Sequence, residues 1–281
     1  MNAAPNKPHC RRSWLPEIVH DFGLHAGSPV RSRWHHVDGC KVHERFIDHL
    51  QSETPIVFVH GLVISSLYFL PLAECLAGDF EVRLPDQPGF GRSEGPLPAP
   101  NVVEMAGWLL RWLDEVGIEQ CHLVANSLGC QIATAMALEA PDRVASATLI
   151  GPTVQPEARS LWRQAVRIIW DAPHEPLQLW VNHASDQMRA GFRRIWQMIF
   201  HMLGDRIEER LPDVRQPVLI MRGKHDPSAP AHWTERVADL IPDSRLITLP
   251  GWHCVHYSHP AETAAVIRDF ILSVQRAKVV A

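Results

Sequence analysis

Short runs of consecutive apolar residues, several of them rich in Val and Ile, recur along the chain and predict buried β-strands. Strands buried on both faces lack the polar–apolar alternation of half-exposed strands, so these runs indicate a mostly parallel sheet. The runs span residues 56–59, 80–84, 121–124, 144–150, 218–221 and 245–249.

Between these runs the apolar residues fall at helical spacing, which predicts helices over 67–77, 101–117, 128–140, 231–241 and 261–274. Asn101 is placed to cap the second of them, and Gly117 is placed to end it. A hairpin is predicted near the N-terminus around Asp38-Gly39. Alternating strands and helices indicate an α/β fold whose sheet is covered by helices on both faces.

The alternation stops between Pro152 and Pro212, where the sequence reads as several amphipathic helices without a strand. We expect a helical insertion after one strand of a parallel sheet to cover the carboxyl ends of the strands, where such sheets bind their ligands. We therefore expect three parts: an N-terminal arm (1–32), an α/β core (33–151 and 212–281) and a helical cap (152–211).

Composition excludes several classes of protein. The 281 residues include 46% hydrophobic and 21% charged residues, and the net charge of -4 argues against a nucleic-acid or anionic-membrane partner. No apolar run of about 7–15 residues follows Arg11 and Arg12, as a secretory signal requires, and no stretch reaches the roughly 18–20 apolar residues of a membrane span. The six cysteines form no Cys-x-x-Cys pair. These features predict a reduced, cytoplasmic protein with no membrane span and no metal site.

The segment Ala125-Asn126-Ser127-Leu128-Gly129 joins a predicted strand to a predicted helix. A small-x-Ser-x-Gly pattern in this setting is typical of a nucleophile elbow, a sharp turn that presents the serine hydroxyl beside a helix N-terminus. The structural alternative is a serine that merely caps the helix. The setting favours Ser127 as a nucleophile.

His60-Gly61-Leu62 directly follows the 56–59 strand. An acyl-transfer intermediate carries an oxyanion, and fixed backbone N–H groups stabilise it without reorganisation. We expect the amides of Leu62 and Leu128 to form this oxyanion hole. As an alternative, His-Gly is only the turn that ends the strand.

A serine nucleophile needs a base, and histidine has an ordinary pKa near the working pH. Among 17 histidines, His253 is favoured because it lies in the loop after the last strand; His256 and His259 compete with it. Asp226 follows the preceding strand, so its carboxylate would lie at the same sheet edge and orient the histidine. The chain order Ser, Asp, His fits this arrangement. We expect activity to fall as the pH drops through about 6.5.

These motifs resemble the α/β-hydrolase superfamily over nearly the whole chain from residue 33. The resemblance rests on the His60-Gly61 turn, the Ser127 elbow, and segments 86–93, 223–226 and 253–260. It implies an eight-stranded, mostly parallel sheet flanked by helices, a helical cap and no cofactor. It also implies that 86–93 is a structural loop near the site.

The sequence departs from the family pattern at three positions. Ala125 replaces the first glycine of the elbow, Cys130 stands where many members have a second glycine after it, and Trp252 replaces the glycine before the base histidine. The family tolerates the first change. The others predict altered helix packing and a narrower site beside His253.

The identity of the nucleophile limits the classes of reaction that the site can catalyse. Related dehalogenases and epoxide hydrolases use Asp at the elbow, whereas Ser127 implies an acyl-enzyme. We expect hydrolysis of a carboxylester, thioester or lactone in a small-molecule substrate. The alternatives are carbon–carbon hydrolysis of a diketone, acyl transfer, or an inactive relative that binds a small molecule.

The cap is unusually aromatic, which favours an apolar or aromatic substrate. We expect Trp252, Trp162 and Trp196 to contact it, although single aromatic residues of such a cap more often pack onto the core. Helical arginines such as Arg163 and Arg194 could bind a substrate carboxylate, but such side chains are usually solvated. A nucleic-acid partner is not expected, and the sequence leaves monomer and homo-oligomer both open.

Overall fold

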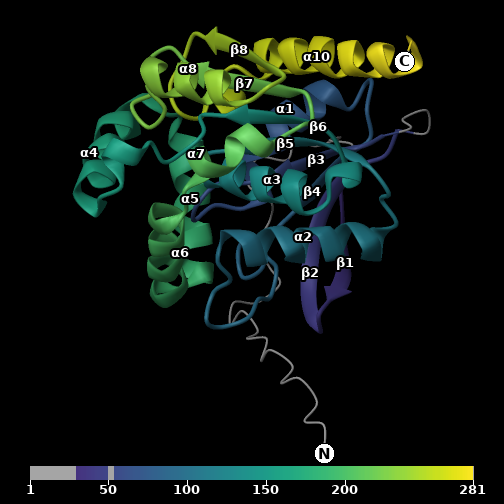
Figure 1. The fold of residues 1–281 in the computed structure, drawn as a ribbon. Coiled ribbons are helices and arrows are strands. Elements are labelled where there is room, and N and C mark those ends of the chain that lie inside the picture. The colour runs from purple at the N-terminus through teal and green to yellow at the C-terminus, as the bar shows by residue number, and fades with distance from the viewer. Residues whose placement is uncertain (1–29, 50–53, 281) are drawn as a thin grey trace, which may run out of the picture.

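The computed structural model describes residues 30–49 and 54–280, and its centre is an eight-stranded sheet (Figure 1). The strands are β1 (Arg31–Val37), β2 (Cys40–Ile47), β3 (Ile56–Val59), β4 (Val82–Pro85), β5 (Cys121–Asn126), β6 (Val144–Ile150), β7 (Val218–Gly223) and β8 (Ser244–Leu249). Their spatial order is β1-β2-β4-β3-β5-β6-β7-β8. Most of the predicted N-terminal arm lies outside the described residues.

The strand pairing confirms the mostly parallel sheet. Only the β1–β2 and β2–β4 pairs are antiparallel, and every pair from β4 across to β8 is parallel. In this register Val59 pairs with Ala125, and Asn126 pairs with Ile150. The residues that follow β3, β5, β6 and β7 therefore meet at one edge of the sheet.

Helices cover both faces of the sheet, as predicted. The α-helices of the core are α1 (Leu70–Leu76), α2 (Val102–Val116), α3 (Leu128–Glu139), α8 (Ala231–Leu240), α9 (Val255–Ser258) and α10 (Pro260–Val280). One apolar cluster joins α2, α3 and α8 to the sheet, and a second joins α1, α9 and α10 to its other face. Burial of these two clusters is the main stabilising term.

The ends of α2 follow the local signals in the sequence. The Asn101 side chain accepts from the Glu104 amide at 3.0 Å, and the Glu104 carboxylate accepts from the Asn101 amide at 2.8 Å. This reciprocal capping box satisfies two amides that the helix leaves unpaired. Gly117 ends the helix with φ 74°, a left-handed conformation that glycine adopts without strain.

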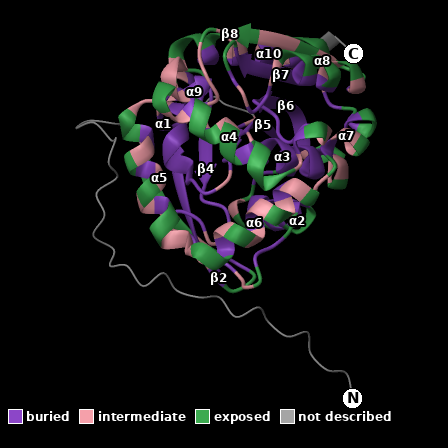
Figure 2. Ribbon diagram, turned by 90° about the vertical axis from the view of Figure 1, so that its left-hand side faces the viewer, coloured by how far each residue is buried: buried purple, intermediate pink, exposed green. Residues whose placement is uncertain are grey.

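Between β6 and β7 the chain forms the predicted helices α4 (Leu161–Asp171), α5 (Leu177–Ala190), α6 (Phe192–Gly204) and α7 (Ile207–Arg210). Short 3₁₀ turns lie at Ser66–Phe69, Pro141–Arg143, Pro156–Ala158, Ala172–His174 and Leu211–Asp213. Helices α4, α5 and α6 lie to one side of the sheet in Figure 1 and face the viewer in Figure 2. Arg194 attaches α6 to the core by donating to the Gly95 carbonyl at 3.1 Å.

Three further observations bear on the sequence predictions. Cys121, Cys130 and Cys254 are buried free thiols, as expected, but Cys40 is disulfide-bonded. Within residues 30–49 and 54–280 no helix is long and apolar enough to cross a membrane. Over the same residues no group of three His, Cys, Asp or Glu side chains is arranged to hold a metal ion.

Candidate active site

Ser127 lies between β5 and α3 in a conformation that few non-glycine residues adopt, with φ 56° and ψ -123°. It is the N-cap residue of α3, but its side chain makes no capping hydrogen bond. A structural cap therefore does not explain it. A Cβ atom on Gly129 would collide with the Val59 carbonyl, so glycine is required where α3 crosses the end of β3.

The turn after β3 approaches this elbow closely. A Cβ on Gly61 would lie 3.3 Å from Ser127 Cβ and 3.3 Å from the Asn126 carbonyl. Leu62 lines the same cavity as Ser127, and the Leu128 amide belongs to the first turn of α3, where N–H groups have no intrahelical partner. Among the described residues, no hydrogen bond from either amide is found. Unpaired amides at these two positions are what the predicted oxyanion hole requires.

Tyr68 connects the two turns, and the sequence interpretation missed it. Its hydroxyl accepts from the Gly61 amide at 2.8 Å and donates to Asn126 Oδ1 at 3.1 Å. The Asn126 amide group in turn donates to the Ile150 carbonyl at 3.0 Å. The hydroxyl of Tyr68 thus fixes the Gly61 turn relative to the elbow. Tyr68 lies in an otherwise ordinary apolar turn, Ser66–Phe69, so no local pattern points to this role.

His60 has a structural role in the same turn. Its Nδ1 donates to the Gly61 carbonyl at 3.0 Å, and its Nε2 accepts from the Gln87 amide at 2.9 Å. This pattern requires a neutral ring, and burial accordingly lowers the pKa of His60 to about 4. The segment 86–93 therefore supports the His60-Gly61 turn through Gln87.

Asp226 and His253 form the predicted acid–histidine pair. His253 Nδ1 donates to Asp226 Oδ2 at 2.9 Å, while Asp226 Oδ1 accepts from the amides of Ser228 at 2.7 Å and Ala229 at 3.0 Å. Burial favours the neutral acid, but the charge and hydrogen bond of His253 and the two amides hold the pKa of Asp226 below its usual range. The carboxylate is therefore ionised and fixed.

Backbone pairing brings the two loops together. The Lys224 amide donates to the Leu249 carbonyl at 2.8 Å, and the His225 amide donates to the Gly251 carbonyl at 3.0 Å. A Cβ on Gly223 would collide with the Trp252 carbonyl, so only glycine permits this approach. The contact continues the parallel β7–β8 pairing beyond the sheet.

Two carboxylates from the cap also reach the His253 loop, and the sequence interpretation missed both. Asp171 Oδ1 accepts from the His253 amide at 3.2 Å, and Glu175 Oε1 accepts from the Cys254 amide at 2.7 Å. Both side chains are buried and line the cavity beside Ser127. Burial raises the pKa of Asp171 and raises that of Glu175 to about 7.

These carboxylates change the expected ionisation of the histidine. Burial lowers the pKa of His253, but the charge and hydrogen bond of Asp226, and then the charges of Asp171 and Glu175, raise it to about 9. The pKa of His253 in this site thus lies above the ordinary value of about 6.5 on which the sequence prediction rested. An imidazolium surrounded by three carboxylates loses its proton only at higher pH.

The two competing histidines lie elsewhere. His256 is buried between the rings of Tyr68 and Phe69, with ring centroids 4.6 Å apart in both pairs. Burial, followed by the charge of His253, lowers its pKa to about 3. His259 Nδ1 lies 3.0 Å from Ser258 Oγ. Neither ring lines the cavity that contains Ser127.

Ser127 and His253 share a cavity of about 300 Å³ between the sheet edge and the cap. Its apolar wall includes Leu62, Val63, Ile64, Leu179, Ile195 and Ile199. Polar groups lie on the cap side, where Gln164, His183 and Gln187 join the two cap carboxylates. A volume at the lower end of the range for ligand sites suits a small substrate with an apolar portion.

The three tryptophans predicted to contact substrate do not line this cavity. The Trp162 side chain is 75% exposed and Trp196 is 43% exposed, both on the outside of the cap. Trp252 stacks on His174 with ring centroids 3.6 Å apart. Instead, the apolar residues that reach the site from α4 and α5 are Ile168, Leu179 and Trp180. None of the cap arginines lines it.

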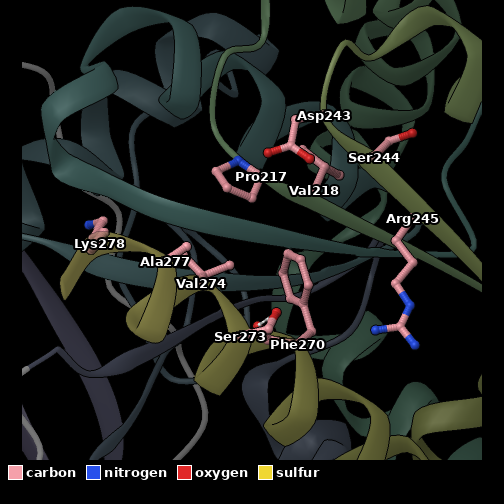
Figure 3. A pocket seen from close by; sticks show the side chains of 10 residues that line it. All are labelled: Pro217, Val218, Asp243, Ser244, Arg245, Phe270, Ser273, Val274, Ala277 and Lys278. Carbon is pink, nitrogen blue, oxygen red and sulfur yellow. Dashed lines mark hydrogen bonds between the residues drawn. The ribbon is translucent and has the colours of Figure 1, made fainter. Parts of the chain in front are cut away.

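A second hollow of about 500 Å³ is larger but lies far from this chemistry (Figure 3). It opens at the amino ends of β7 and β8, beside Val218 and Ser244, whereas Asp226 follows the carboxyl end of β7. Its lining contains no histidine. We therefore place the candidate active site in the smaller cavity at the carboxyl ends of the strands.

The sheet order, the strained serine after β5 and the buried Asp226–His253 pair define a protein of the α/β-hydrolase class. A family model described as alpha/beta hydrolase fold matches residues 54–190, and solved structures of hydrolases superpose on most of the chain. The chain belongs to the α/β-hydrolase superfamily.

The named proteins that resemble this chain match it at low sequence identity. The chain is 29% identical over 241 residues to RutD of Azorhizobium caulinodans, which carries the name of a carbamate hydrolase; the match covers 78% of this chain and 90% of that protein. It is 26% identical over 239 residues to the poly(3-hydroxyalkanoate) depolymerase of Ectopseudomonas oleovorans, covering 78% and 84%. The enol-lactonase of Burkholderia xenovorans LB400 superposes with a TM-score of 0.72 at 18% identity, covering 85% and 100%. The last likeness shows the fold alone.

Proposed function

We propose that this protein is a serine hydrolase that cleaves an ester-like bond of a small, partly apolar substrate through an acyl-enzyme on Ser127. One observation carries the proposal. Ser127 lies in a strained elbow where its side chain makes no capping hydrogen bond, and it shares a cavity with His253, which is hydrogen-bonded to the buried Asp226 carboxylate. This arrangement supplies nucleophile, base and orienting acid together.

The proposed reaction has two halves. Neutral His253 accepts the Ser127 proton as Oγ attacks the substrate carbonyl, and the amides of Leu62 and Leu128 stabilise the oxyanion that forms. Collapse of this intermediate expels the leaving group, which takes the proton from His253. Water, deprotonated by His253, then attacks the acyl-enzyme; as this second intermediate collapses, His253 returns the proton to Ser127 Oγ and the acid is released. Asp226 stabilises the imidazolium in both halves and keeps Nδ1 protonated.

The cavity supports carboxylesters, thioesters and lactones whose acyl group is small enough for about 300 Å³ and packs against the isoleucine and leucine wall. The name of one relative, a poly(3-hydroxyalkanoate) depolymerase, supports an ester substrate. The name of RutD adds a carbamate, a carbonyl compound that the same serine can attack. We therefore propose a substrate panel that contains both classes.

The direct test is the intact mass of the protein after exposure to a fluorophosphonate, a reagent that labels activated serines. The wild type should gain one phosphonyl group, and Ser127→Ala should gain none. Ser228→Ala is the matched control because Ser228 lines the same cavity but lies outside the elbow, so this variant should still be labelled. A folded wild type that gains no mass would reject the proposal and favour a binding protein.

A further inference from the structure

The outer surface of the cap is apolar to an unusual degree. Among the described residues, every exposed large apolar side chain except Trp34 and Val103 lies between residues 161 and 200. Those with the largest exposed fractions are Leu177 (79%), Phe192 (78%), Trp162 (75%), Met188 (72%), Ile169 (69%) and Trp170 (66%). Figure 2 colours many residues of α4, α5 and α6 as exposed. Monomeric proteins that are fully solvated rarely gather such side chains in one place. We call it the cap face.

Helix α4 buries polar residues and exposes apolar ones, the reverse of an ordinary amphipathic helix, and α5 does so in part. In α4 the buried residues are the polar Gln164 and Asp171, while Ile169 and Trp170 point outward. In α5 the polar Asn182 and Asp186 are buried together with the apolar Leu179, while Leu177 and Met188 are exposed. A helix in water normally buries its apolar side, so this distribution indicates a second environment outside the cap.

The charges of the cap face have one sign. Between residues 161 and 204 all three acidic side chains, Asp171, Glu175 and Asp186, are buried, whereas Arg163 and Arg193 are exposed. No carboxylate between these positions reaches the surface. The net charge of -4 argued against an anionic membrane, but it averages over the whole chain and hides this local basic surface.

We propose that the cap face docks on an anionic lipid surface. Helices that lie in a membrane interface are rich in tryptophan, phenylalanine, leucine and arginine. Their apolar side chains lie among the acyl chains, and their cations lie at the lipid headgroups. A second copy of the chain fits less well, because it would set Arg163 and Arg193 against the same basic surface without opposing carboxylates.

Docking would also bring the candidate active site to the lipid. Ile168 of α4 is more than half exposed and yet lines the cavity that contains Ser127. Ile199 of α6 lines it as well. The cap face and the cavity therefore share helices, and an apolar substrate leaving the lipid would have a short path to Ser127. Binding itself does not depend on the chemistry of Ser127.

The test is flotation of the full chain with vesicles of phosphatidylcholine alone and of phosphatidylcholine mixed with phosphatidylglycerol. The wild type and Ser127→Ala should both float with the anionic vesicles, and added salt should weaken binding. Arg193→Glu should weaken it by about fivefold or more. Replacing Ile169 and Trp170 together by serine should weaken it by at least about tenfold.

Matched controls lie on the core. Val103→Ser removes an exposed apolar side chain from α2, and Arg215→Glu reverses an exposed charge before β7; both should bind as the wild type does. Far-ultraviolet circular dichroism and thermal melting establish that each variant is folded. Wild type that stays unbound, or that floats equally with neutral vesicles, overturns the proposal. The proposal is also overturned if the wild type is a dimer and the Ile169/Trp170 double variant is a monomer. The cap face would then bind a second copy of the chain.

Discussion

At the scale of single residues, the candidate site depends on positions whose geometry cannot be relaxed. Ser127 keeps a positive φ of 56° because the turns around it are fixed from both sides. The Tyr68 hydroxyl holds the Gly61 amide on one side and Asn126 on the other. Such groups do not touch the reacting atoms, but they hold the groups that do. Small displacements of oxyanion donors reduce rates strongly.

We predict that Tyr68→Phe reduces kcat by about 10–100-fold with a smaller change in KM, because the Gly61–Leu62 turn loses its anchor. The measurement is steady-state hydrolysis of the best ester found. Tyr257→Phe is the matched control, since Tyr257 is the only other tyrosine in the chain and does not line the cavity. Normal turnover of a folded Tyr68→Phe variant would contradict the positioning role.

At the scale of elements, the cap contributes to the site as well as covering it. The segment from the end of α4 through the following turn places Asp171 and Glu175 on the backbone amides of His253 and Cys254. The histidine loop is thus held by the cap, while its acid partner Asp226 comes from the core. The same two carboxylates, with Asp226, keep the pKa of His253 at about 9.

The pH dependence follows from this cluster. His253 must be neutral to accept a proton, so kcat/KM should rise as the pH increases toward and through about 9. Glu175→Gln removes a negative charge that raises this pKa, and its profile should therefore shift to lower pH. Initial rates across the pH range measure both. Glu157→Gln, which removes an exposed acid just before α4, should leave the profile in place; an equal shift in both variants would reject the explanation.

At the scale of the whole molecule, Asp86 connects parts that are distant in sequence. Its fully buried carboxylate accepts from His43 Nδ1 at 2.8 Å, the Ser66 amide at 2.9 Å and the Arg92 amide at 3.0 Å. Burial alone would favour the neutral acid, but Arg45 and His43 hold the pKa of Asp86 well below its usual range. The carboxylate therefore joins β2, the turn before α1 and the loop that supports His60.

We predict that Asp86→Asn lowers the free energy of unfolding by about 3 kcal/mol, because the buried Arg45 and His43 lose the negative charge of Asp86. Urea denaturation followed by circular dichroism measures the change. Asp38→Asn is the control, because Asp38 forms an exposed ion pair with Arg111 in the hairpin turn and should change stability by less than about 1 kcal/mol. A loss of similar size in both variants would contradict the special role of Asp86.

Signals that are local in sequence were enough to predict much of this protein. Strand β3 and the ends of α2 follow from runs, periodicity and caps within a few residues, and the fold class follows from their order. Ser127, Asp226 and His253 could be selected because each comes directly after a predicted strand. In a parallel sheet those positions meet at one edge whatever the details of packing.

Tertiary structure decided the rest, because it depends on which surfaces face each other. Periodicity showed that the cap helices have apolar sides but not that Trp162 and Trp196 point outward while Ile168 reaches the cavity. Asp171 and Glu175 lie about 80 residues from the histidine whose ionisation they change, so no local pattern could connect them with it. The sequence by itself determined the fold and the candidate catalytic side chains; only three-dimensional packing determined their charge state, the groups that hold them in place and which cap residues face the cavity.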